Sequence, residues 1–316
     1  MALGTAHMTT TTHTKFIPEL WSDEVVAAYK SNLVLANLVT RMNHSGKKGD
    51  TIHIPKPTRG AASAKAAQTE VTLIAATETE LTVSIDKHFE YSRMIEDILE
   101  KQALSSMRTF YTDDAGYALA KQADTHLWLQ AYTLTGGTIN TVSSGTTVDF
   151  GTAGTVIGSD GSTAFNAGND NAAALADAGI RKVIQTLDDN DIPMGDRFFV
   201  IPPVEKKNLT GLARFTEQAF VGEAGAGNSI RNGLVGDVYG IPVYVSTNCP
   251  LDTEGSQDAR LCLMAHKSAL VMAEQMSVRT QTQYKQEWLG DLFTADTIYG
   301  TGELRNDAGI KIAVVA

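Results

Sequence analysis

Two alternating runs of apolar and polar residues constrain the fold more than any other feature of the sequence. The first covers residues 69–74 (TEVTLI) and the second residues 81–89 (LTVSIDKHF), and residues 75–79 separate them. Strict alternation rich in Val, Ile and Thr predicts a long two-stranded hairpin with a soft tip. Because ordering each residue costs about 1–2 kcal/mol and two strands bury little surface, we expect contacts outside the hairpin to hold it in place.

Composition indicates a folded chain that does not clamp nucleic acid. The 316 residues are 43% hydrophobic, enough for one core and, we expect, two. Asp and Glu outnumber Lys and Arg by 36 to 26, and a net charge of -10 argues against a protein that grips phosphate backbones. The two cysteines, Cys249 and Cys262, are too few for a disulfide scaffold or a structural zinc cluster, fit a reducing compartment and are expected to be buried.

We expect no membrane segment and no secretory signal. No run approaches the roughly 20 apolar residues that span a bilayer, and the N-terminus lacks a basic-then-apolar layout. Residues 1–14 are small and polar, and Met8 is a candidate start after a leader, so this stretch is left out of the fold prediction.

A long helix is predicted after the hairpin. No proline occurs between Pro57 and Pro193, and apolar residues recur at three- and four-residue steps over 92–132. At a rise of 1.5 Å per residue such a helix would be about 60 Å long, unless it breaks near Gly116. That length exceeds what a compact domain of this size needs.

The other segments predict a sheet covered by helices. A short helix and an extended continuation are expected in 18–40, and a strand in 51–54 after a glycine turn. Residues 133–171, rich in Gly, Thr and Ser, are expected to form a loop-rich insertion outside the core. The remaining predictions are helices over 172–187 and 204–220, strands at 198–201 and 240–246, a flexible loop at 221–233, and a final strand at 310–314 that returns to the sheet beneath the long helix.

Motifs for catalysis or ligand binding are not found. The glycine-rich segment 222–227 (GEAGAG) lacks the Gly-Lys-Ser/Thr ending of a phosphate-binding loop, and no Gly-x-Ser-x-Gly elbow occurs. The seven histidines have no four-residue pairing, and the acidic turn at 188–196 has Ile192 where a calcium loop needs an oxygen ligand. We therefore predict no catalytic residue, no cofactor and no metal, and a role in assembly.

Four motifs, in this order, resemble the major capsid proteins of tailed bacteriophages with the Hong Kong 97-like fold. They are 16–22 (FIPELWS), 49–55 (GDTIHIP), 196–203 (DRFFVIPP) and 236–246 (GDVYGIPVYVS). The resemblance implies an α+β fold with five parts. These are an N-terminal arm (1–50), an extended β-hairpin loop (51–91), a peripheral domain with a spine helix (92–170), an axial domain with helices around a sheet (171–270), and a return to the peripheral sheet (271–316).

The resemblance also implies what the chain assembles with. Subunits would form hexamers and pentamers of an icosahedral virion shell, built in the host cytoplasm with a scaffolding protein, a portal and a possible decoration protein, around double-stranded DNA without sequence-specific contact. The hairpin residues expected to contact a neighbouring subunit are Val71, Leu73, Leu81, Val83 and Ile85. The residues expected near the symmetry axis are Gly222, Gly225, Gly227 and Arg231. Lys65 near the hairpin tip is expected to be solvated and not to form a covalent cross-link.

Two other classes of protein remain open from the sequence. An encapsulin-like compartment would share the fold and would need a cargo-peptide groove formed by the arm and the spine helix. An enzyme with an α/β core would need an accessible cluster of polar residues with perturbed pKa values. Particle formation separates the two shell-forming classes from the enzyme.

Overall fold

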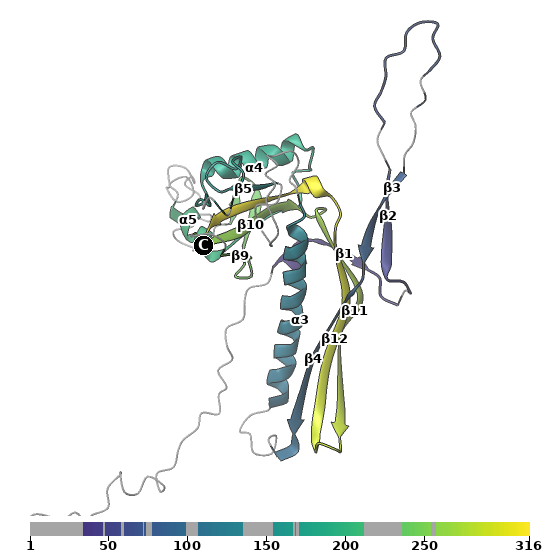
Figure 1. Ribbon diagram of the computed structural model, residues 1–316, viewed down its shortest axis with the longest axis vertical. Helices are drawn as coiled ribbons and strands as arrows, with labels where there is room; N and C mark the ends of the chain where they lie inside the picture. Colours follow the sequence, from purple (N-terminus) through teal and green to yellow (C-terminus); the bar gives the residue numbers. More distant parts are fainter. Residues whose placement is uncertain are drawn as a thin grey trace, which may run out of the picture.

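Two β-sheets joined by one long helix organise the chain in the computed structural model (Figure 1). The structure describes residues 34–46, 48–57, 60–71, 73, 78–98, 107–134, 154–166, 168, 171–211, 236–253 and 257–316. One sheet carries helices and forms a compact body. The other is a narrow, elongated sheet with the long helix beside it, and a β-hairpin projects from their junction (Figure 1).

The compact body is built on a seven-stranded sheet. Its strands run in the order β5 (Thr155–Ile157), β13 (Gly309–Val315), β10 (Ala259–His266), β6 (Arg197–Ile201), β8 (Ile241–Val245) and β7 (Asp237–Val238), and β9 (Leu251–Asp252) pairs with β10. Helices α4 (Asp177–Asp189) and α5 (Pro203–Gly211) belong to the same body (Figure 1). Every residue of β6 is buried, which explains why the four residues after Arg197 (198–201, FFVI) are a continuous apolar run and not an alternation.

The elongated sheet has four strands. Their order is β1 (Thr40–Asn43), β11 (Leu270–Lys285), β12 (Gly290–Glu303) and β4 (Lys87–Glu96). Helix α3 (Met107–Ala131) lies along this sheet, and Ala115 and Leu119 form a small core with Phe293 and Ala295 (Figure 1). The C-terminal end of α3 belongs to the large core of the compact body, because Leu127 is buried there. One helix therefore contacts both sheets.

The two sheets meet at a short junction. Residues 267–269 connect β10 to β11, and residues 304–308, which include a 3-10 turn (Asn306–Ala308), connect β12 to β13. The backbone N–H groups of Leu304 and Arg305 both donate to the carbonyl of Ala269, at 2.9 and 3.3 Å. A short helix, α1 (Leu35–Leu38), precedes β1 and packs in the large core.

The hairpin differs from the sequence prediction in its pairing partner. Strand β2 (Thr51–Pro57) pairs antiparallel with β3 (Glu78–Ser84), whereas the prediction paired 69–74 with 81–89. Of the predicted first strand, residues 69–71 and 73 are described and lie outside any strand. Both 51–57 and 69–74 alternate. In the first segment Ile52 and Ile54 pack against the small core at the elongated sheet, and this burial favours the first segment as the partner of β3.

The long helix begins later than predicted. Residues 92–96 belong to β4, where Ser92 pairs with Thr294 and Glu96 with Gly290, and α3 starts at Met107. Strand pairing with β12 overrides the helix-like spacing of the apolar residues here. The helix continues through Gly116 without a break, so the break considered there is wrong.

Two further predictions fail in the strands of the compact body. Residues 155–157 were expected outside the core, yet β5 pairs in parallel with β13 and Val156 is fully buried. The final strand was expected in the sheet beneath the long helix, but β13 pairs with β10 in the seven-stranded sheet.

The strands at 198–201 and 240–246 are confirmed as β6 and β8, and the helix predicted over 172–187 is observed as α4. Most of the predicted helix at the N-terminus, the second half of the helix over 204–220, and the loop at 221–233 lie outside the described residues.

Truncating Leu127 tests the link between α3 and the large core. We expect Leu127→Ala to lower the free energy of unfolding by about 2–5 kcal/mol, because the side chain is completely buried. Leu129→Ala is the matched control on the same helix, where the leucine is 47% exposed, and should cost well under half as much. Urea unfolding of unassembled subunits measures both changes, and equal losses would contradict the packing.

Buried Lys311 should make subunit stability depend on pH. Burial lowers the pKa of its ammonium group to about 8, and its Nζ donates to the carbonyl of Tyr132 at 2.8 Å. Between about pH 8 and pH 10.5 the unfolded chain keeps a proton that the folded chain has released, so this group makes stability rise with pH, by up to about 3 kcal/mol. Lys311→Met should flatten the rise in urea unfolding measured at pH 7.5 and pH 10, whereas exposed Lys65→Met should not. Unchanged pH dependence in Lys311→Met would contradict the lowered pKa of the buried Lys311.

Candidate inter-subunit surfaces

The root of the hairpin is fixed to its own subunit. Val83 and Ile85 are 1% and 7% exposed and form a small core with Val271 and Ala273 of β11. The N–H of Ile85 also donates to the carbonyl of Asp50 at 2.7 Å. Val83 and Ile85 therefore present almost no side-chain surface to a neighbouring subunit, contrary to the prediction. Leu81 is half-buried.

Close backbone approach explains why the root of the hairpin sits where it does. A Cβ atom on Gly300 of β12 would lie 2.2 Å from the carbonyl oxygen of Ser84, and one on Gly302 would lie 3.1 Å from a methyl group of Val83. Only glycine at position 300 allows β3 to cross β12 at this distance. Apolar packing thus holds the two strands together, and the glycines of β12 leave the space for their close approach.

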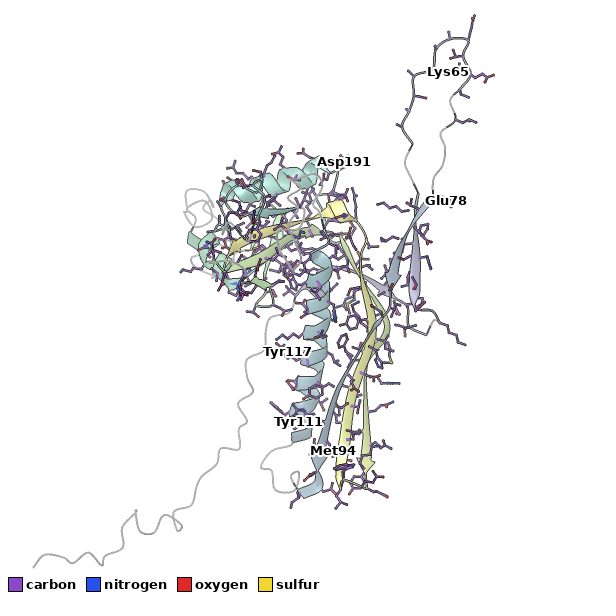
Figure 2. The ribbon with its side chains drawn as sticks, in the orientation of Figure 1. Lys65, Glu78, Met94, Tyr111, Tyr117 and Asp191 are labelled. Atoms are coloured by element: carbon purple, nitrogen blue, oxygen red, sulfur yellow. The ribbon has the colours of Figure 1, made fainter. Side chains whose placement is uncertain are left out.

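The distal part of the hairpin projects into solvent, and we call it the extension (60–71 and 73). All of its residues are exposed, and Figure 2 shows Lys65 near its end, far from the rest of the chain. Val71 and Leu73 are 67% and 89% exposed, so both apolar side chains lie in solvent in the isolated subunit. The predicted contact residues Val71 and Leu73 therefore have free surface, and their contact with a neighbour stays a prediction.

Asp124 of α3 joins three parts of the chain. Its carboxylate accepts hydrogen bonds from the N–H of Leu35, at 3.0 Å, and from Nδ2 of Asn248, at 2.8 Å. Burial raises the pKa of this carboxyl group, while its hydrogen bonds oppose the shift. The start of α1 is thereby fixed to α3.

An aromatic cluster holds α3 against the elongated sheet. Nδ1 of His126 lies 2.7 Å from the hydroxyl oxygen of Tyr299, and the ring of Phe89 lies 5.0 Å from the His126 ring. Burial lowers the pKa of His126, which favours the neutral imidazole. Nearer the N-terminal end of the helix, the hydroxyl of Tyr91 donates to the carboxylate of Asp114 at 2.8 Å. These contacts, far apart in sequence, keep the helix and sheet as one unit.

The end of the elongated sheet farthest from the compact body carries a second exposed apolar surface that sequence analysis missed. Trp288 and Leu289, in the turn between β11 and β12, are 64% and 66% exposed. The hydroxyl of nearby Tyr284 donates to Asp97 at 2.8 Å. The signal in the sequence was a large apolar pair in a turn, where polar residues are usual. The apolar members of this surface are Met94, Ile98, Tyr284, Trp288 and Leu289.

The described part of the chain holds no group of three or more His, Cys, Asp or Glu that could bind a metal ion. Both cysteines are buried and free, and burial raises the pKa of Cys249 to about 12.

A shallow, mostly apolar pocket of about 240 Å³ lies between α3 and residues 247–250. None of the helices among the described residues is long and apolar enough to cross a membrane. The loop predicted to lie near the symmetry axis, with Gly222, Gly225, Gly227 and Arg231, lies outside the described residues.

Comparisons with known proteins agree with this geometry. A family described as phage capsid protein matches residues 13–313. Among solved structures, one from Mycobacterium phage Che8 is 22% identical, with a TM-score of 0.71 and coverage of 94% of this chain and 97% of that one. The capsid structure of cyanophage P-SCSP1u is 19% identical, with a TM-score of 0.71 and coverage of 95% and 94%. The mature capsid of bacteriophage PhiM1 is 14% identical, with a TM-score of 0.71 and coverage of 99% and 97%. No curated protein sequence matches the chain significantly.

Adding a methyl group at Gly300 tests the root of the hairpin. Gly300→Ala should lower the thermal unfolding midpoint, because a Cβ atom 2.2 Å from the Ser84 carbonyl forces β3 and β12 apart. Gly116→Ala is the matched control, since its Cβ would have no atom within 4 Å and alanine favours a helix by about 1 kcal/mol over glycine. Calorimetry should show a lower midpoint for the first variant and an equal or higher one for the second. A Gly300→Ala protein as stable as the unaltered chain would contradict the close approach.

Proposed function

The chain belongs to the phage capsid protein family and is a major capsid protein with the Hong Kong 97-like α+β fold, and on this premise we propose that it builds an icosahedral shell from hexamers and pentamers. The observation that carries the proposal is the extension, whose exposed Val71 and Leu73 have no partner surface on their own subunit. In the proposed shell, each extension lies on an adjacent subunit.

The arrangement of the extension favours rings. It leaves the molecule on one side of the junction, while the elongated sheet extends the other way (Figure 1). A contact between two different surfaces of identical subunits is head-to-tail, and such contacts close into rings when the rotation between subunits allows it. Pentamers and hexamers are two such closures of the same contact. The exposed apolar end of the elongated sheet, with Trp288 and Leu289, supplies a further surface for contacts beyond one ring.

We propose that the chain acts structurally and not as an enzyme, in the capsid of the virion. Its proposed partners are further copies of itself, a scaffolding protein and a portal, with a decoration protein as an optional further one, and assembly takes place in the host cytoplasm. The net charge of -10 supports packaging of double-stranded DNA without sequence-specific contact, because an acidic wall binds phosphate weakly. The family match does not favour the encapsulin-like alternative.

Shortening the extension tests this function. A variant that lacks residues 60–73 keeps β2 and β3 and the buried Val83 and Ile85, so its subunit should fold with an unfolding midpoint close to that of the full chain. The same variant should form no closed particles, because the exposed part of the hairpin is gone. Electron microscopy and sedimentation velocity measure assembly, and calorimetry measures folding.

A pair of point variants controls for the deletion. Leu73→Asp should reduce assembly at least tenfold by placing a charge on the proposed contact, whereas Ala62→Asp, at another exposed position of the extension, should reduce it much less. Shells from the shortened protein as abundant as those of the full chain would overturn the role of the extension. A full-length protein that stays monomeric even with its genomic neighbours would overturn the shell itself.

A further inference from the structure

The outer half of β11 is an open strand edge. On the side of β11 away from β12, β1 pairs only with residues 271–274, and no other strand of the described chain pairs with this side from 277 to 285. In Figure 1 this stretch forms the outer margin of the elongated sheet. This edge is long, has few charges and no proline, and exposes Val278. Its unpaired backbone groups can bind a further strand, and folded proteins normally cover or block such an edge.

The extension contains a segment suited to cover such an edge. Residues 69–73 (TEVTL) alternate and are rich in β-branched residues, and those of them that the structure describes lie outside any strand. Val71 and Leu73 are two residues apart, so in a strand their side chains would share one face. The chain thus has a strand-forming segment without a sheet and a sheet edge without a strand.

Charge favours their association. Residues 277–285 (SVRTQTQYK) include Arg279 and Lys285 and no acidic residue, whereas residues 69–73 (TEVTL) include Glu70 and no basic residue. Arg279 already donates to the carboxylate of Asp296, at 2.7 Å, but its side chain is still 53% exposed. Opposite charges along two strands favour their pairing over the pairing of either with a copy of itself.

The pairing has to occur between subunits. The extension and the outer half of β11 project from opposite ends of the molecule, so a subunit cannot reach its own open edge (Figures 1 and 2). The occupant is therefore the same segment of a second copy.

We propose that residues 69–73 of one subunit add as a strand to the open edge of β11, residues 277–285, of a neighbouring subunit. The elongated sheet then gains a strand from another chain, and backbone hydrogen bonds hold the contact while side chains set its register. This inference rests on the proposed shell function, and it specifies the acceptor surface and the kind of bonding.

Disulfide trapping in assembled particles tests the proposal. Subunits with Val71→Cys are co-assembled under reducing conditions with subunits that carry one cysteine in turn at each position from 277 to 285, and the particles are then oxidised. Native Cys249 and Cys262 are buried and should not interfere. Because successive side chains of a strand point to opposite faces, we expect cross-linked dimers on a denaturing gel with a period of two, at least tenfold stronger at the favoured positions.

A matched control and a second measurement make the result decisive. Ser92→Cys lies on β4 at the opposite edge of the same sheet and should give no dimer with Val71→Cys. In unaltered particles, amide hydrogen exchange should slow in both 69–73 and 277–285 relative to unassembled subunits. Dimers without the two-residue period, dimers equally strong at Ser92, or unchanged exchange in both segments would overturn the pairing. If particles form in these experiments, such a result leaves the shell function intact, whereas a failure of the unaltered chain to form particles overturns that function.

Discussion

The crossing of β3 over β12 determines the rest of the architecture. At this point two glycines, Gly300 and Gly302, allow the backbone of one strand to lie against the other, and Val83 fills the space beside them. The hairpin is therefore anchored at one end by a small core and exposed at the other. A segment with a fixed root and a solvent-exposed end can reach a neighbour in a defined direction, which a loop anchored at random could not do.

Two buried charged groups show how the larger body accepts polar atoms inside its core. Asp124 is satisfied by donors from two other segments, and Lys311 by the carbonyl of Tyr132. Such groups contribute little net stability but penalise every arrangement in which their partners are missing. They fix the relation of α1, α3 and the seven-stranded sheet more strictly than apolar packing alone.

The sequence allowed the fold family and the most apolar strands to be predicted, and it misled where two segments had equivalent patterns. Residues 198–201 could be recognised because a strand buried on both faces is apolar throughout. The hairpin could not be paired correctly, since alternation shows that a segment can be a strand but not which strand it meets. Residues 92–96 have helix-like spacing and form a strand only because β12 lies beside them. Of the candidate contact residues, Val71 and Leu73 are exposed as expected, whereas the burial of Val83 and Ile85 depends on residues 271 and 273, far along the chain.

The junction between the two sheets is narrow. The chain crosses it through residue 39, residues 267–269 and residues 304–308, and α3 spans it as a continuous rod. Because α3 packs in both cores, through Leu119 in the small one and Leu127 in the large one, the two sheets cannot tilt relative to each other without disturbing that packing. A shell made of such subunits would therefore adapt to flat and sharply curved facets at the contacts between subunits.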